Sequence, residues 1–252
     1  MLRFYGLAQN LGSDQPFYAL QAQGLNAKYP CHTRAEDMAA HYLKEIRSVQ
    51  SQGPYFLGGY SFGGMIALEM AQQLIAEGEE PPLVILFDTF CPVRGKPSSR
   101  KLSSPFLKIL RISGSERRAY LSRVATAPLR VIHWGLHVAR LPRMVRKVRN
   151  ACLRAARYYV PRAYPGRVIL FRSSREPLGG FSDPYAGWSE YIANGLEVYE
   201  VKSDHDNILL EPQVRFVAEQ LRTCLDEAQA AHQATQQPHA IETVNASVQL
   251  LA

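Results

Sequence analysis

Short apolar runs alternate along most of the chain with longer segments in which apolar residues recur at helical spacing. Runs at 55–59, 83–88, 166–172 and 196–201 are rich in Leu, Val, Ile, Phe and Tyr, which favours strands. The run at 83–88, LVILFD, is almost wholly apolar, as is typical of a parallel strand covered on both faces. The apolar run PFYAL at 16–20 predicts one further buried strand.

Helical segments lie between these runs. A short helix is predicted over 3–11, and longer ones over 34–50, 65–78 and 212–228. Strands that alternate with helices are typical of an α/β fold whose mostly parallel sheet carries helices on both faces. The alternation breaks at 92–162, which predicts an inserted helical subdomain.

The inserted segment also carries most of the positive charge. The chain has a formal net charge of +7, but Arg94 to Arg162 holds 18 Lys and Arg residues and only one acid, Glu116. Such a segment can attract an acidic partner, because opposite charges raise association rates. The alternative is that these cations simply solvate one face of the helices. No nucleic-acid-binding motif is evident, so nucleic acid is not expected as a partner. Basic amphipathic helices can also bind an anionic membrane surface, but membrane contact is the less favoured interpretation.

Composition places the chain among globular proteins. Hydrophobic residues make up 46% of its 252 residues and charged residues 20%, and there is no transmembrane-length apolar run and no secretory signal pattern. The four cysteines lie at least 60 positions apart, which suggests neither a zinc site nor a disulfide framework. We therefore expect reduced thiols and a cytoplasmic protein. The tail from about residue 230 is polar and is expected to be poorly ordered.

The most informative motif is Gly-x-Ser-x-Gly at 59–63, centred on Ser61. A predicted strand enters it and a predicted helix leaves it, which is the setting of a nucleophile elbow. Such a turn exposes the serine hydroxyl at the helix N-terminus, where the backbone N–H of Phe62 can face a developing oxyanion. The alternative is a tight turn with an idle serine.

A serine nucleophile needs a base, and the base needs an orienting acid. Asp88 ends the next predicted strand, and His205 follows the last one, so both fit the chain order Ser, Asp, His. The alternatives are a solvated acid and a surface histidine. Asp204 and Asp206 flank His205 and are interpreted as loop-capping or positioning groups.

No metal site is predicted. His133 and His137 stand four residues apart on a predicted helix, but no carboxylate cluster accompanies them.

The stretches PFYALQAQGL, GPYFLGGYSFGGMIALEMAQQL, GRVILFR, the GW pair at 187–188 and SDHDNILLEP resemble the thioesterase domain that ends nonribosomal peptide synthetases and polyketide synthases. The resemblance runs from about residue 3 to residue 227. It implies an α/β-hydrolase fold in a domain spanning 1–229, with a helical lid at 92–162 and a disordered tail at 230–252.

The resemblance also implies the chemistry. Ser61 would be the nucleophile, His205 the base, Asp88 the orienting acid and the Phe62 N–H an oxyanion donor. The substrate would be an acyl or peptidyl thioester presented on the phosphopantetheine of a carrier domain, with no bound cofactor. Release would follow by hydrolysis or by cyclisation. Three apolar lid residues are candidates for an acyl channel: Phe106, Leu110 and Trp134.

The chain departs from the family pattern at one place. The family begins with an apolar strand and a glycine loop that supplies a second oxyanion N–H, and neither precedes residue 3 in this sequence. An alternative interpretation follows, in which the chain is an impaired, thioesterase-like fragment that only binds carrier or acyl chains. A lipase or general esterase is the third interpretation, less favoured because the stretch around Ser61 is closer to the synthetase thioesterases.

Overall fold

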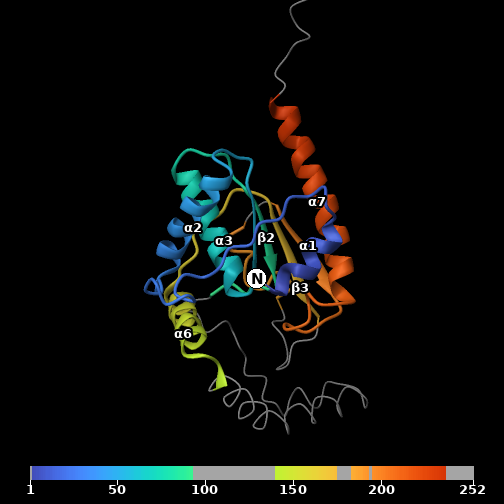
Figure 1. Ribbon diagram of the computed structural model, residues 1–252. Coiled ribbons are helices and arrows are strands. Elements are labelled where there is room, and N and C mark those ends of the chain that lie inside the picture. Colours follow the sequence, from blue (N-terminus) through green and yellow to red (C-terminus); the bar gives the residue numbers. More distant parts are fainter. Residues whose placement is uncertain (1, 93–139, 175–182, 193–194, 237–252) are drawn as a thin grey trace, which may run out of the picture.

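Four parallel strands form the central layer of the protein, which we describe from a computed structural model over residues 2–92, 140–174, 183–192 and 195–236 (Figure 1). They are β1 (Phe56–Tyr60), β2 (Leu83–Phe87), β3 (Val168–Ser173) and β4 (Leu196–Val201). Their order in the sheet is β1-β2-β3-β4, each strand pairing in parallel with the next one along the chain. All four correspond to predicted apolar runs, and the parallel arrangement is confirmed.

On one face of the sheet, α3 (Phe62–Ala76) packs against β1 and β2, and α2 (Ala35–Val49) and α6 (Arg143–Tyr158) pack against α3. A large apolar core fills this side and includes Leu68, Leu86 and the fully buried Trp188. The middle of α6 lies beside the first half of α2, since Val148 and Ala151 line a small cavity together with Met38. Of the segment predicted as a lid, residues 93–139 lie outside the described residues.

The opposite face is covered by two helices from distant parts of the chain. A short 3-10 turn (Leu2–Phe4) leads into α1 (Tyr5–Leu11), which packs against α7 (Gln213–Gln236). The sequence predicts that this last helix ends at residue 228 and that disorder begins near 230. That boundary is wrong, because the helix continues through an Ala- and Gln-rich stretch whose residues favour helix even without an apolar face.

The segment 16–20 is not a strand, contrary to the sequence prediction. It is an exposed connection between α1 and α2, in which Tyr18 is 71% exposed. Phe17 makes an aromatic contact, at 6.1 Å from the Phe4 ring centroid. An apolar run becomes a strand only where a neighbour can pair with its backbone, and none of the strands in the described ranges lies beside this one.

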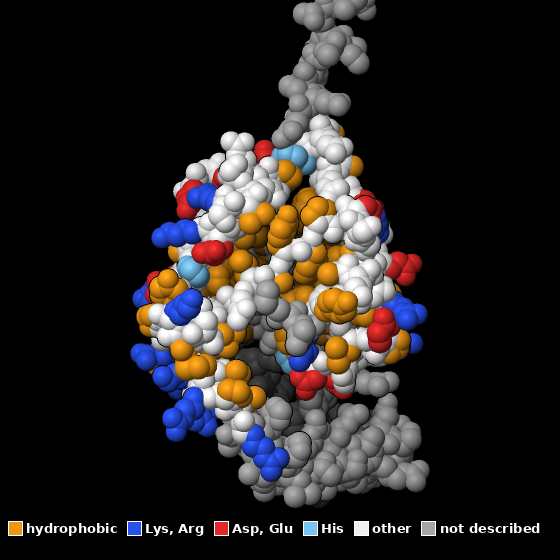
Figure 2. All heavy atoms as spheres, in the orientation of Figure 1, with side chains coloured by type: hydrophobic (Ala, Val, Ile, Leu, Met, Phe, Trp, Pro, Cys, Tyr) orange, Lys and Arg blue, Asp and Glu red, His pale blue; other side chains and the backbone are white. Residues whose placement is uncertain are grey.

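The outer edge of β1 has no partner among the strands of the described residues. Leu57 and Gly59 of β1 are buried, whereas Gly58 between them is exposed. Figure 2 shows hydrophobic side chains in a hollow between the α2–α3 side of the molecule and α7.

The four cysteines are free thiols, and two of them, Cys91 and Cys224, are buried. No helix in the described ranges has the length and apolar character needed to cross a membrane.

Candidate active site

Ser61 occupies a sharp turn between β1 and α3. Its backbone has φ 53° and ψ −120°, in the positive-φ region that a residue with a side chain rarely adopts. The Ser61 N–H donates to the carbonyl of Phe87 on the neighbouring strand at 2.8 Å. The strained turn is therefore anchored to the sheet, and the strand–turn–helix setting predicted for a nucleophile elbow is present.

The glycines around Ser61 are required by close backbone approach. A Cβ on Gly59 would lie 2.1 Å from the carbonyl carbon of Gly63, and a Cβ on Gly64 would lie 2.1 Å from Thr89 Oγ1. The strand and the first turn of α3 can pass each other only without side chains at these positions. Thr89 then closes the turn from the next strand, since its hydroxyl donates to the Ser61 carbonyl at 2.9 Å.

Asp88 lies at the carboxyl end of β2 and is fully buried. One carboxylate oxygen accepts the Ser173 N–H at 2.8 Å. The other accepts the Ser173 hydroxyl at 2.8 Å and lies 2.7 Å from His205 Nδ1. Asp88 also has a positive φ of 48°, so its backbone turns out of the strand at this point.

The hydrogen bonds decide the charge of Asp88. Burial opposes ionisation and is the largest single influence on its pKa. The bonds from His205 and from Ser173 act in the other direction, and together they hold the pKa of Asp88 below its ordinary value. Asp88 is thus a carboxylate at neutral pH, and it can only accept from His205 Nδ1–H. The imidazole then has a free lone pair on Nε2, as a general base requires.

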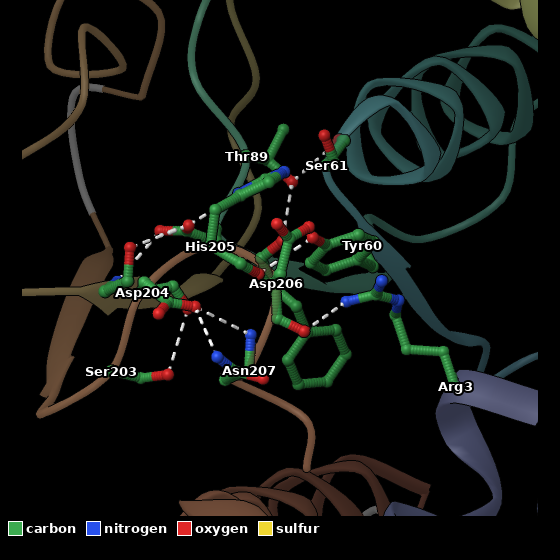
Figure 3. Close-up of polar contacts among 12 residues, drawn as sticks. Arg3, Tyr60, Ser61, Thr89, Ser203, Asp204, His205, Asp206 and Asn207 are labelled. Atoms are coloured by element: carbon green, nitrogen blue, oxygen red, sulfur yellow. Dashed lines mark hydrogen bonds and ion pairs between the residues drawn. The ribbon is translucent and has the colours of Figure 1, made fainter. Parts of the chain in front are cut away.

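His205 lies in the loop after β4, and its side chain is 36% exposed. It reaches the same edge of the sheet as Ser61 and Asp88, because these residues all follow the carboxyl ends of parallel strands. Figure 3 shows His205 on its loop, with Ser61 at the start of the neighbouring helix. No direct hydrogen bond joins Ser61 Oγ to His205 within the described part of the chain. Such bonds often tighten only when a substrate binds.

The Phe62 N–H is the first of helix α3 and has no acceptor within the helix. It therefore lies at a helix N-terminus, next in sequence to Ser61, where an anion is favoured.

Several residues of this cluster were not singled out by the sequence. Ser173 ends β3 and could have been found, because it shares the sheet edge with Asp88. Trp188 donates to the Thr89 carbonyl at 2.8 Å and so supports the residue that holds Ser61. Tyr60 and Arg3 contact the His205 loop, and no periodicity could have indicated that.

Of the two acids that flank His205, Asp204 caps the loop as predicted. Asp204 accepts the backbone N–H of Asn207 at 3.1 Å and its side-chain amide at 2.8 Å, which caps the loop. The contact of Asp206 is made by its backbone carbonyl, which accepts from Arg3, so a role for its carboxylate stays a prediction.

The family model of the thioesterase domain matches residues 2–225, which is most of the chain. The chain belongs to the thioesterase domain family. Its fold is the α/β-hydrolase fold of thioesterase domains.

Similar proteins are large synthetases. The chain is 28% identical over 237 residues to a dimodular nonribosomal peptide synthase of Bacillus subtilis (strain 168), a match that covers 89% of this chain and 10% of that protein. It is 32% identical over 206 residues to malpinin synthetase of Mortierella alpina, covering 81% of this chain and 2% of that protein. This thioesterase domain therefore spans a tenth or less of the length of these relatives.

Solved structures agree on the fold. The NocB thioesterase domain, solved as a covalent complex with a fluorophosphonate nocardicin G analog, is 26% identical, and the match covers 89% of each chain with a TM-score of 0.63.

Some predicted residues lie outside the described residues. These are the channel candidates Phe106, Leu110 and Trp134, whose role stays a prediction, and the histidines His133 and His137, for which no metal role is predicted. No group of three or more His, Cys, Asp or Glu side chains in the described ranges could hold a metal ion.

Proposed function

We propose that this chain is a serine thioesterase that releases an acyl or peptidyl chain from the phosphopantetheine thioester of a carrier domain. The observation that carries the proposal is the pairing of an ionised, buried Asp88 with His205 Nδ1 at 2.7 Å, at the sheet edge where the elbow presents Ser61. A nucleophile, a base and an orienting acid in that order supply what acyl transfer requires.

The first half-reaction transfers the acyl chain to the enzyme. His205 Nε2 removes the Ser61 proton as Oγ bonds to the thioester carbonyl carbon, and Asp88 stabilises the imidazolium that forms. The Phe62 N–H faces the oxyanion, and one such donor is worth about 2.7–4 kcal/mol of barrier. The C–S bond then breaks, the sulfur leaves with the proton from His205, and an acyl ester remains on Ser61.

The second half-reaction frees the product. His205 takes a proton from water or from a nucleophile on the acyl chain itself, and that oxygen or nitrogen attacks the ester carbonyl. The C–O bond to Ser61 breaks, and His205 returns the proton to Oγ. Water gives hydrolysis and an internal nucleophile gives cyclisation, so one site serves both outcomes.

The charge of α6 supports a carrier as partner. The helix carries six Lys and Arg side chains and no acid: Arg143, Arg146, Lys147, Arg149, Arg154 and Arg157. Figure 2 shows Lys and Arg gathered on this side of the molecule. The curated relatives are multidomain synthetases, in which such a domain acts beside others on one chain. An acidic carrier surface would be steered toward α6.

The direct test is covalent labelling with a fluorophosphonate serine probe, read by intact mass and peptide mapping. We expect the wild type to gain one label on Ser61 and the Ser61→Ala variant to gain none, with circular dichroism showing both folded. The related NocB domain has been solved in complex with a fluorophosphonate analog, which makes this probe class suitable. A folded wild type that takes no label would contradict the proposal and favour the alternative of a binding-only fragment.

Charge reversal on α6 tests the partner. The variant Arg143→Glu/Lys147→Glu/Arg154→Glu changes three exposed side chains, and we expect acylation by a carrier-bound substrate to slow about tenfold at low ionic strength. Turnover of a small pantetheine thioester should stay within about twofold, because it needs no docking surface. Both rates are measured by stopped-flow release of thiol.

The matched control spreads the same charge change over three other segments, as Lys28→Glu/Lys44→Glu/Arg215→Glu. If the control slows the carrier reaction equally, net charge rather than α6 is responsible. If the α6 variant slows both substrates equally, the helix has no part in docking.

A further inference from the structure

The residue before the nucleophile holds the residue proposed as the base. Tyr60 ends β1, and its ring stacks on the imidazole of His205 with 4.8 Å between centroids and 29° between planes. Its hydroxyl donates to the backbone carbonyl of His205 at 2.8 Å. One side chain therefore contacts both the ring and the backbone of His205.

Arg3 extends this contact from the segment before α1. Its guanidinium carbon lies 4.4 Å from the centroid of the Tyr60 ring, within the range of a cation–π interaction. Its Nη1 donates to the carbonyl of Asp206 at 2.7 Å. Figure 3 shows these side chains converging on the loop that carries His205. Residues 3, 60 and 205 come from three segments that are far apart in the sequence.

We propose that Tyr60 and Arg3 are positioning residues that fix the His205 loop, so that the imidazole stays aligned between Asp88 and Ser61. The loop is polar and partly exposed, and the Asp88 bond holds only one atom of the ring. Tyr60 adds two further restraints: its ring fixes the plane of the His205 imidazole, and its hydroxyl fixes the His205 backbone. Arg3 restrains the next residue of the loop.

The restraint acts through geometry and not through charge on Tyr60. Burial raises the pKa of Tyr60 to about 12, and the Arg3 cation opposes that rise only in part. Tyr60 is thus a neutral phenol and a hydrogen-bond donor throughout the range in which a serine hydrolase works. Removing its hydroxyl should lower the rate without moving the pH dependence.

The test compares Tyr60→Phe with the wild type. Because it measures the reaction of Ser61, this part of the test rests on the proposed function. Second-order rates of fluorophosphonate labelling are measured from pH 5 to pH 10. We expect the maximal labelling rate of Tyr60→Phe to be about tenfold lower than that of the wild type, since misplacing a reacting group by about 1 Å can lower a rate about 10²-fold. The pH at which the labelling rate is half-maximal should not change.

Tyr55→Phe is the matched control. Tyr55 also donates to a backbone carbonyl, that of Gln50 at 3.1 Å, but it lies at the other end of β1. Its variant should label at the wild-type rate. Equal rates for Tyr60→Phe and the wild type would overturn the proposal for Tyr60, because the variant keeps the ring and loses only the hydrogen bond.

The Arg3 arm uses rescue by a conservative variant. We expect Arg3→Met to label about threefold to fivefold more slowly, and Arg3→Lys, which keeps a cation and a donor, to recover at least half of the loss. An unchanged rate in Arg3→Met would remove Arg3 from the proposal.

A readout without reaction separates the two proposals. NMR relaxation of isotopically labelled His205 reports the order of its ring whether or not Ser61 reacts. We expect greater ring mobility in Tyr60→Phe than in the wild type or Tyr55→Phe. An unlabelled wild type would overturn the proposed function alone, whereas unchanged ring order in Tyr60→Phe would overturn the positioning role.

Discussion

Replacing Asp88 by Asn is expected to lower the turnover of an acyl-pantetheine thioester about 10⁴-fold while leaving the protein folded. Asn can occupy the buried site but carries no charge, and its amide can donate to His205 Nδ1. The imidazole is then held with its proton on Nε2, which is the tautomer that cannot accept from Ser61. Steady-state kinetics at neutral pH measure the effect, and the loss should appear in kcat.

The control is Asp206→Asn, which removes a carboxylate of the same loop whose side chain is exposed. It should stay within about twofold of the wild type. A comparable loss in both variants would mean that general electrostatics near His205, and not the Asp88 bond, governs the rate.

Asp88→Asn is also expected to change how the free energy of unfolding depends on pH. The pKa of Asp88 is lowered in the folded protein, so its ionised form stabilises the fold above the ordinary carboxyl pKa of about 3.9. That contribution is lost as the pH falls through the lowered folded value. Urea unfolding should show Asp88→Asn less stable by roughly 1–3 kcal/mol at pH 7. The difference in unfolding free energy between the wild type and Asp88→Asn should narrow below about pH 4. A difference that stays constant with pH would contradict an ionised Asp88 in the folded protein.

Replacing Gly59 by Ala is expected to destabilise the fold by about 3 kcal/mol and to abolish labelling of Ser61. The new methyl group would lie 2.1 Å from the backbone carbonyl of Gly63, which is part of α3 and cannot turn aside as a side chain could. Relief requires β1 and α3 to separate, which opens the turn that exposes Ser61. Thermal unfolding and fluorophosphonate labelling measure the two consequences.

Gly58→Ala is the matched control on the same strand. Its nearest neighbours would be 3.5 Å or more away, at Phe87 and Ile85, so a methyl group fits there at van der Waals distance. We expect a change below about 1 kcal/mol and normal labelling. If Gly58→Ala and Gly59→Ala lose stability and labelling equally, the requirement for glycine belongs to β1 in general and not to the turn at Ser61.

The sequence predicts the parts of this site that depend on strand ends. Ser61, Asp88 and His205 each follow an apolar run, and parallel strands bring their carboxyl ends to one edge, so the order of elements alone places the three residues together. The segment at 16–20 shows where this reasoning fails. Its apolar pattern resembles that of a strand, but pairing depends on a neighbour that composition cannot reveal.

The supporting contacts were beyond prediction for a related reason. Tyr60 stands inside the Gly-x-Ser-x-Gly motif, but its partner is a loop 145 residues away, and Arg3 is 203 residues from Asp206. Such contacts arise when formed helices, strands and loops pack together, and no periodic pattern in the sequence indicates them. The helix α7 runs past its predicted end because Ala and Gln extend a helix by propensity alone, without the apolar face that marks its beginning.

The strand order has a consequence for how the protein folds. Each strand pairs with its neighbour along the chain, so the sheet can grow from β1 to β4 as the chain leaves the ribosome. Helix α1, in contrast, packs against α7, so it cannot dock until α7 has been synthesised. The contacts of highest sequence separation, Arg3 with Asp206 and Tyr60 with His205, close at the same late stage, because long loops are the slowest to close. A nascent chain would therefore hold a nearly complete sheet before the proposed base is in place, and reactivity at Ser61 would mark the completion of folding.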